Sequence, residues 1–213
     1  MSCYIALDGP DGCGKSSQSQ ALCEWLRGAG HDVLHVREPG STPAGEALRN
    51  LLLSPATGAL QTVTEVLLFS AARAELVHEV IGPALAAGRI VVAERCYLST
   101  LVYQVLAMES PFDAQSFFDL TRKVHGACLP DAIYLLDVPP SVAAARRRSR
   151  RADRIEARGA DYEAKVRAGF RRATQLEVRA VTIDAAWPFA SVQASLRARV
   201  ARLLEPTAAR RRA

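Results

Sequence analysis

The chain has 213 residues, 49% hydrophobic and 23% charged, which is ordinary for one globular domain and excludes extensive disorder. Its net charge of +5 is concentrated in two runs. Residues 146–158 hold seven arginines against two acidic residues, and Arg210–Arg212 add three more, so the remaining residues together carry about −3. A charge this localised favours a small anionic ligand under an arginine-rich flap, and we expect no nucleic-acid partner.

Local segments of the sequence indicate where in the cell the protein is found. Residues 3–7 are apolar but too short for the core of a signal peptide, and the sequence contains no transmembrane run. We therefore expect a cytoplasmic protein without a membrane partner. Five scattered cysteines lack the two-residue spacing of a zinc or redox site, so we expect reduced thiols at Cys3, Cys13, Cys23, Cys96 and Cys128.

The first predicted strand, residues 3–7, leads into a phosphate-binding pattern. Gly9-Pro10-Asp11-Gly12-Cys13-Gly14-Lys15-Ser16 fits Gly, four residues, Gly, Lys and Ser or Thr, and a helix is predicted over 17–27. Glycines let successive backbone N–H groups point at phosphate oxygens, and the helix adds its positive end. Lys15 is expected to reach the β and γ phosphates, and Ser16 to hold Mg²⁺. The expected ATP-binding residues are Gly9, Asp11, Gly12, Cys13, Gly14, Lys15, Ser16 and Ser17.

Strands and helices alternate along the rest of the chain. Further strands are predicted over 32–36, 89–93, 132–137 and 180–183. Helices are predicted over 44–53, 62–87 (adjusted at Pro83), 99–108, 114–125, from Pro139 into the arginine-rich segment, 161–174 and 189–204. This order predicts an α/β fold, a five-stranded parallel sheet flanked by helices on both faces. We expect one domain over 1–205, with a lid at about 146–158 and a disordered basic tail at 206–213.

Ligands of such sheets bind beyond the carboxyl ends of the strands. At one such end, Glu94-Arg95 followed by Ser99 and Tyr103-Gln104 resembles the Asp-Arg-Tyr, Ser and Tyr-Gln pattern of thymidylate kinases. Other stretches resemble the same family in the expected order, over about residues 3–185: the phosphate loop with Asp11, Arg37-Glu38-Pro39-Gly40 with Gly45-Glu46 and Arg49, Leu68-Phe69 with Ala72-Arg73, and Asp153-Arg154-Ile155-Glu156.

The resemblance implies a P-loop nucleoside monophosphate kinase fold, a homodimer, and transfer of the γ-phosphoryl of ATP to dTMP with Mg²⁺. It implies that Arg37, Arg49 and Arg95 bind the acceptor phosphate. Phe69, Arg73, Ser99, Tyr103 and Gln104 would line the base and sugar pocket, and Asp11 would contact the sugar 3′-hydroxyl. From the residues alone, other roles stay open: core packing for Phe69 and Tyr103, a turn for Asp11, solvated arginines at 37 and 49, and an Arg95–Glu94 ion pair.

The phosphate loop has Gly12 where some members of the family carry an arginine, which resembles the bacterial subgroup with its catalytic arginine in the lid. The sequence does not choose among Arg146, Arg147, Arg150, Arg151 and Arg154, and such a run is also typical of a solvated helix face. We take Arg147, Arg150 and Arg154 as catalytic candidates beside Lys15 and Arg95.

Two departures from the family pattern concern the metal and the substrate. Glu94 stands where Asp is usual, and Cys96 where Tyr is usual, so a metal-binding role for Glu94 requires an adjusted geometry. Two alternative functions remain: another P-loop nucleotide or deoxynucleoside kinase, and a non-catalytic nucleotide-dependent binding protein, which predicts salt-dependent nucleic-acid binding without phosphoryl transfer.

Overall fold

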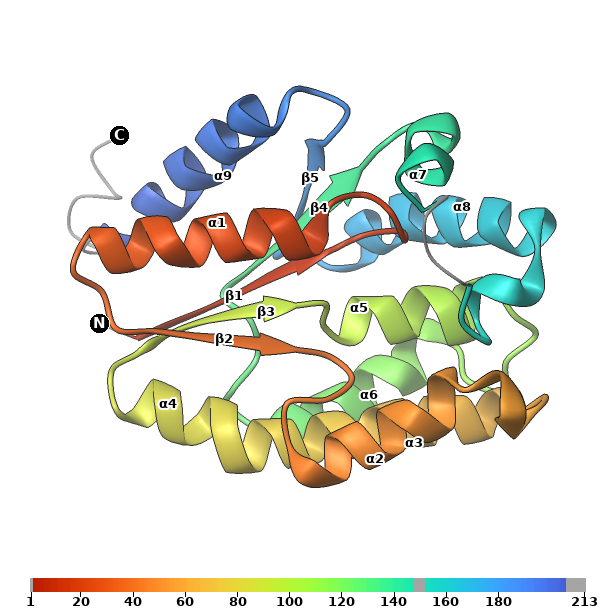
Figure 1. Ribbon diagram of the computed structural model, residues 1–213. Coiled ribbons are helices and arrows are strands. Elements are labelled where there is room, and N and C mark those ends of the chain that lie inside the picture. Colours follow the sequence, from red (N-terminus) through yellow and green to blue (C-terminus); the bar gives the residue numbers. More distant parts are fainter. Residues whose placement is uncertain (1, 148–151, 206–213) are drawn as a thin grey trace.

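A computed structural model describes residues 2–147 and 152–205. Within them the chain forms a five-stranded, all-parallel sheet in the order β2-β3-β1-β4-β5. Helices pack on both faces of this sheet (Figure 1), which confirms the predicted α/β architecture. The strands are β1 (Cys3–Asp8), β2 (Val33–Arg37), β3 (Ile90–Glu94), β4 (Ala132–Asp137) and β5 (Ala180–Asp184).

The helices follow the predicted order. They are α1 (Lys15–Gly28), α2 (Pro43–Leu53), α3 (Thr62–Leu76), α4 (Gly82–Ala86), α5 (Tyr97–Thr100), α6 (Ala114–His125), α7 (Pro140–Arg147), α8 (Ala160–Leu176) and α9 (Phe189–Leu204). Short 3₁₀ turns lie at η1 (Pro55–Thr57) and η4 (Glu156–Arg158), and π-helical turns at η2 (Val77–Ile81) and η3 (Leu101–Leu106).

The central strand β1 divides the apolar core into two halves. Tyr4 and Ala6 belong to the core under α3, α5, α6 and α8, whereas Cys3, Ile5 and Leu7 belong to the core under α1, α7 and α9. Every residue of β1 is buried, as expected for a parallel strand with helices on both sides. The phosphate loop that follows β1 therefore starts from a fully buried strand at the centre of the sheet.

Two predicted helices change their geometry along their length. The helix predicted over 62–87 is α3, the π turn η2 and α4 in succession, with Pro83 as the second residue of α4. Proline removes an N–H donor, and a π turn is one way to accommodate that loss. The helix predicted over 99–108 begins earlier, at Tyr97, and continues as η3 to Leu106.

The predicted lid at 146–158 is described only at its two ends. Arg150 and Arg151 lie outside the described residues, as does the tail predicted at 206–213. In the part of the chain that the structure describes, no helix has both the length and the apolar character needed to cross a membrane.

Candidate active site

The phosphate loop connects the end of β1 to the start of α1. Gly9, Gly12 and Gly14 adopt φ angles of 136°, 83° and 98°, a region that favours glycine. The side chain of Lys15 is buried, and its Nζ donates to the carbonyl oxygens of Gly9 and Pro10, at 2.9 Å each. The loop thus holds the ammonium group of Lys15 at its centre.

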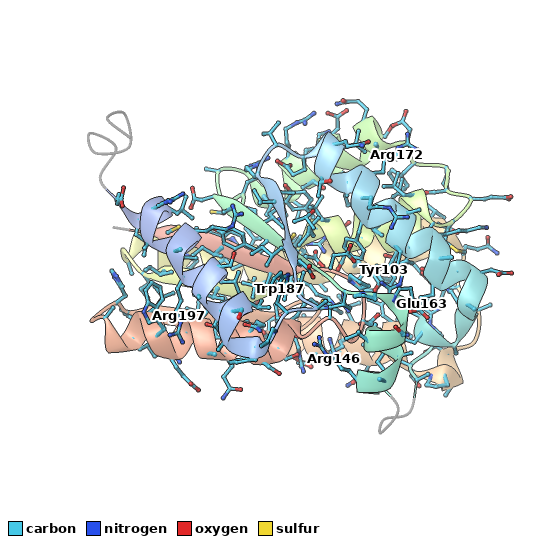
Figure 2. All side chains as sticks on the ribbon, turned by 90° about the horizontal axis from the view of Figure 1, so that it is seen from above. Tyr103, Arg146, Glu163, Arg172, Trp187 and Arg197 are labelled. Atoms are coloured by element: carbon cyan, nitrogen blue, oxygen red, sulfur yellow. The ribbon has the colours of Figure 1, made fainter. Side chains whose placement is uncertain are left out.

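Helix α7 closes one side of this loop. A Cβ atom at Gly12 would lie 2.5 Å from the carbonyl oxygen of Ala143, so any side chain at Gly12 requires α7 to move. Arg146, also on α7, lies beside the start of α1 (Figure 2). Its Nη1 is 3.3 Å from the carbonyl oxygen of Cys13, and its Nη2 is 3.4 Å from that of Ala185. Gly12, the loop position where some relatives carry an arginine, is therefore next to Arg146 of α7.

Ser16 and Glu94 meet at the open side of the loop. The Ser16 hydroxyl donates to Oε1 of Glu94 at 2.6 Å. A hydroxyl and a carboxylate are hard oxygen ligands suited to Mg²⁺, which typically takes one or two protein ligands and completes its shell with water and phosphate oxygens. Among residues 2–147 and 152–205 there is no cluster of three His, Cys, Asp or Glu side chains that would suit another metal.

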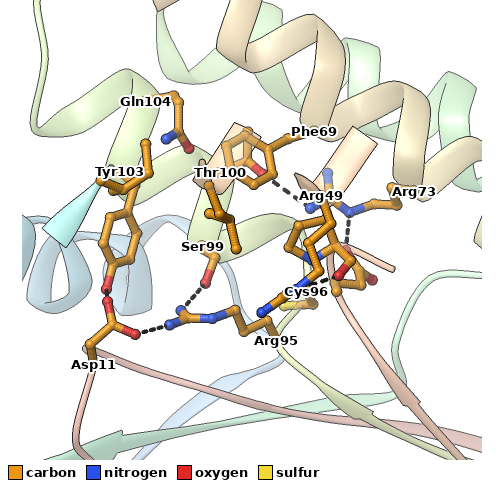
Figure 3. Close-up of a pocket in the computed structure, with 14 residues that line it drawn as sticks. Asp11, Arg49, Phe69, Arg73, Arg95, Cys96, Ser99, Thr100, Tyr103 and Gln104 are labelled. Carbon is orange, nitrogen blue, oxygen red and sulfur yellow. Dashed lines mark hydrogen bonds and ion pairs between the residues drawn. The ribbon is translucent and has the colours of Figure 1, made fainter. Parts of the chain in front are cut away.

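Arg95 connects the phosphate loop to α5. Its guanidinium forms an ion pair with Asp11 and donates to Ser99 Oγ at 2.9 Å (Figure 3). The backbone of Arg95 has φ 73°, a left-handed conformation that costs a non-glycine residue about 1–3 kcal/mol. The sequence left an Arg95–Glu94 ion pair open as an alternative. In the structure Arg95 pairs with Asp11 instead, and Glu94 accepts a hydrogen bond from Ser16.

Tyr103 completes the group around Asp11. Its hydroxyl donates to Asp11 Oδ2 at 2.8 Å, and the Arg95 guanidinium lies 5.6 Å from the centre of its ring. Burial and the neighbouring Asp11 raise the pKa of Tyr103 well above its usual value. The phenol therefore stays protonated and remains a hydrogen-bond donor.

Asp8 organises these residues from below. The fully buried carboxylate at the end of β1 accepts hydrogen bonds from the backbone N–H of Gly9 at 2.8 Å, Ser99 Oγ at 2.6 Å and the backbone N–H of Cys96 at 3.2 Å. It fixes the start of the phosphate loop relative to α5. No role was assigned to Asp8 from the sequence.

A second cavity opens beside the phosphate loop, between α2, α3 and η3. Its lining comprises Asp11, Glu38, Pro39, Arg49, Leu53, Phe69, Arg73, Arg95, Cys96, Ser99, Thr100, Tyr103, Gln104 and Ile155. A larger cavity over the loop is lined by Asp11, Gly12, Gly14, Lys15, Ser16, Ser17, Arg37, Glu38, Arg49, Glu94, Arg95 and Arg146. Four residues border both cavities, Asp11, Glu38, Arg49 and Arg95.

A buried ion pair forms the floor of the second cavity. Arg73 Nε donates to Glu38 Oε2 at 2.6 Å, and Arg73 Nη2 donates to Thr100 Oγ1 at 3.0 Å. Both charged side chains are at most 4% exposed. Burial raises the pKa of Glu38 even though Arg73 opposes the shift. No role was assigned to Glu38 from the sequence, although a charged residue directly after a strand end is a candidate for a ligand site.

The other predicted residues occupy different surroundings. Arg49 donates to the Pro39 carbonyl oxygen at 2.9 Å, whereas Arg37 is half exposed and pairs with Glu46. Phe69 lines the second cavity and is only partly buried, and Ser17 is exposed at the edge of the loop cavity.

The two described catalytic candidates of the lid do not border the phosphate-loop cavity. Arg147 pairs with Glu163 of α8 at 2.8 Å. Arg154 is buried against Glu65 at 2.7 Å and donates to the Leu52 carbonyl oxygen. Arg146, which the sequence left undecided, is the described lid arginine that reaches the loop.

Comparisons with known proteins agree on one family. The family model described as thymidylate kinase matches residues 7–196. A thymidylate kinase of Symbiobacterium thermophilum is 39% identical over 99% of this chain and 96% of its own length. One from Pseudomonas fluorescens is 40% identical over 95% of this chain and 96% of its own. The crystal structure of thymidylate kinase from Ehrlichia chaffeensis superposes with a TM-score of 0.74 at 27% identity, covering 93% of this chain and 98% of that one.

Proposed function

The chain belongs to the thymidylate kinase family and transfers the γ-phosphoryl group of ATP to dTMP, and from this premise we propose which of its residues carry out the reaction. Its fold is that of the P-loop nucleoside monophosphate kinases. The observation that carries the assignment is the meeting of two cavities at Asp11, Glu38, Arg49 and Arg95. A donor over the loop and an acceptor in the second cavity would bring their phosphates together there.

On the donor side, the phosphate loop and Lys15 bind the ATP phosphates. Ser16 and Glu94 hold Mg²⁺, which supplies charge neutralisation of the phosphate oxygens when bound. The hydrogen bond between these two side chains supports the pairing, because it shows that one small cation can be reached by both oxygens. In this proposal the longer Glu94 carboxylate takes the place of the usual aspartate.

On the acceptor side, Phe69 stacks on the base, and Arg73 and Gln104 provide polar contacts at its edge. The partial burial of Phe69 on the cavity wall supports the stacking role over core packing. Asp11 and Tyr103 face the sugar. Arg95 and Arg49 bind the acceptor phosphate where the two cavities meet, with Ser99 fixing the Arg95 guanidinium. Arg37 is a weaker candidate, because it is engaged with Glu46.

The reaction requires little covalent chemistry from the protein. The acceptor phosphate is already an anionic nucleophile at neutral pH, so we assign no general base, and catalysis rests on positioning and charge compensation. We assign the cation nearest the migrating group to Arg146, because its guanidinium contacts the phosphate loop. Arg147, Arg150 and Arg154 remain predictions; the ion pairs of Arg147 and Arg154 make them the less favoured candidates.

We also propose that the protein acts as a homodimer. The support is a set of exposed apolar side chains on two adjacent helices, Leu51 on α2 with Val63 and Leu67 on α3. Sedimentation velocity tests the proposal: wild type should sediment as a dimer, and Leu67→Glu should shift it toward monomer. A monomeric wild type at micromolar concentration contradicts it.

The substrate assignment is tested by an ADP-release assay with dTMP, dUMP, UMP, dCMP, dGMP and dAMP as acceptors. We expect dTMP to have the highest kcat/KM, and a preference of about tenfold for another acceptor overturns the assignment. Lys15→Ala should abolish turnover, whereas Arg95→Ala and Phe69→Ala should mainly raise the KM for dTMP. Arg122→Ala is the matched control, because Arg122 is exposed on α6 and pairs only locally with Asp119.

A further inference from the structure

Glu65, in the first turn of α3, is almost fully buried and binds side chains from two distant segments. Its Oε1 accepts hydrogen bonds from Arg154 at 2.7 Å and from Arg158. Its Oε2 accepts one from Nε2 of Gln104 at 3.2 Å. A buried carboxylate with this set of partners is compensated in charge and hydrogen-bonded on both of its oxygens.

The two arginines belong to a segment that is attached to the acceptor side of the molecule. Arg154 Nε donates to the Leu52 carbonyl oxygen at 2.7 Å, and the Arg154 backbone N–H donates to the Leu53 carbonyl oxygen at 3.1 Å. The Arg158 guanidinium lies 5.0 Å from the centre of the Tyr162 ring. Residues 153–162 are therefore anchored to the C-terminal end of α2 and to α3, and Glu65 is the charged centre of that attachment.

The same segment contacts the second cavity. Ile155 lines it, and the Tyr162 hydroxyl donates to the Tyr103 carbonyl oxygen at 2.7 Å. The position of residues 153–162 and the shape of the acceptor cavity are therefore mechanically linked through packed, hydrogen-bonded groups.

The third partner of Glu65 determines what Gln104 offers to a ligand. A carboxylate accepts but does not donate, so it selects the NH₂ end of the Gln104 amide. The carbonyl oxygen of Gln104 is then the group available to the cavity that this residue lines (Figure 3). A carbonyl oxygen accepts from the imide N–H of thymine or uracil, whereas the corresponding ring nitrogen of cytosine is itself an acceptor.

We propose that Glu65 is a positioning residue that couples the seating of residues 153–162 to the orientation of Gln104 in the base pocket. This inference rests on the proposed placement of the acceptor base against Phe69 and Gln104. Glu65 does not touch the substrate. It acts by holding two cations of the lid segment with one oxygen and by selecting one rotamer of an amide with the other.

The substitution Glu65→Gln distinguishes a positioning role of the carboxylate from a role in core packing alone. The new amide has nearly the same shape, yet it can donate to Gln104 and so permits the flipped amide, and it leaves Arg154 and Arg158 without their shared counter-charge. Two readouts follow: the ratio of kcat/KM for dTMP to that for dCMP, and the hydrogen exchange of amides 153–162 measured by mass spectrometry without nucleotide.

Glu177→Gln is the matched control. Glu177 is also a buried glutamate, and it accepts from the Tyr97 hydroxyl at 2.6 Å and from Arg179, and it lines neither cavity. We expect Glu65→Gln to lower the dTMP to dCMP ratio by about tenfold and to speed exchange in 153–162 by about tenfold, each the effect of losing one charged hydrogen bond. Glu177→Gln should change neither.

Four outcomes would contradict the proposal or its premise. Wild-type selectivity and exchange in Glu65→Gln, or equal losses in Glu177→Gln, overturn it. If Glu65→Gln does not fold by circular dichroism, Arg158→Met replaces it, because Arg158 is partly exposed and its loss leaves Arg154 paired; unchanged exchange at 153–162 in that variant is equally contrary. A wild-type enzyme that does not prefer dTMP over dCMP contradicts the base-pocket assignment itself, whatever the variants do.

Discussion

The Ser16 hydroxyl donates a 2.6 Å hydrogen bond to the Glu94 carboxylate, although 78 residues separate the two in the chain. Parallel pairing of β1 with β3 brings them together, because it sets Leu7 opposite Glu94 at the same edge of the sheet. The phosphate loop and the end of β3 therefore form one oxygen-lined corner, and the position of that corner follows from strand register.

Replacing Glu94 tests this corner as the Mg²⁺ site. Glu94→Gln removes the negative charge but keeps the size of the side chain, so we expect the Mg²⁺ concentration for half-maximal rate to rise by about tenfold. The measurement is the initial rate against Mg²⁺ concentration at saturating ATP and dTMP. Glu94→Asp should retain most of the metal affinity, and an unchanged Mg²⁺ requirement in Glu94→Gln would exclude Glu94 as a ligand.

The arginines of α7 are distinguished by paired substitutions. Arg146→Ala is expected to lower kcat by about 10²- to 10³-fold, because a cation near the migrating phosphoryl group is lost. Arg147→Ala, one residue along and paired with Glu163, should lower kcat by less than about tenfold. Single-turnover rates measure the effect on the chemical step directly. Similar losses in the two variants contradict the assignment of Arg146.

The buried pair of Glu38 and Arg73 is expected to contribute to stability as well as to the pocket. Glu38→Gln leaves a buried arginine without its counter-charge, and we expect the free energy of unfolding to fall by about 3 kcal/mol in urea denaturation. Asp119→Asn breaks the exposed pair with Arg122 and should cost less than about 0.5 kcal/mol. If Glu38→Gln lowers the free energy of unfolding as little as the control does, the Glu38–Arg73 pair contributes no more to stability than an exposed ion pair.

His125 makes stability depend on pH. Burial, with a smaller contribution from Arg73, lowers the pKa of His125 to about 3, from 6.5 in the unfolded chain. Between these values the unfolded state binds the extra proton, so stability is fully present above pH 6.5 and decreases as the pH falls. From pH 7 to pH 5 the decrease attributable to His125 is about 2 kcal/mol.

Comparison with His125→Phe isolates this contribution from other titrating groups. The phenyl ring can retain the edge contact with Tyr97, at 5.4 Å between ring centres in the wild type, but cannot take up a proton. The difference in unfolding free energy between variant and wild type, measured by urea denaturation at pH 7 and pH 5, should change by about 2 kcal/mol in favour of the variant. Parallel curves would mean that His125 titrates normally in the folded state.

Local patterns in the sequence were sufficient for the sheet and the phosphate loop. A buried strand before Gly9 and a helix over 17–27 after the loop are short-range signals, and the strand ends then identify Arg95 and Glu94 as site residues. The order of motifs was sufficient to identify the family.

Long-range contacts were not predictable in this way. In the sequence Glu65 is simply an acidic residue near the start of a predicted helix, and its partner Arg154 lies 89 residues away. Arg146 and Arg147 follow the buried Ala143 by three and four residues, so helical periodicity puts both on the packed side of α7. The choice between them depends on which neighbour each reaches, the phosphate loop or α8, and only the tertiary structure decides that.

The left-handed backbone of Arg95 has a consequence for protein engineering. Glycine adopts φ 73° without strain, and asparagine tolerates it better than arginine, so either relieves the backbone strain at this position. Neither supplies a guanidinium to Asp11 or to an acceptor phosphate. The strained backbone is therefore kept where the guanidinium is needed, which makes position 95 a point where a relaxed backbone and activity oppose each other.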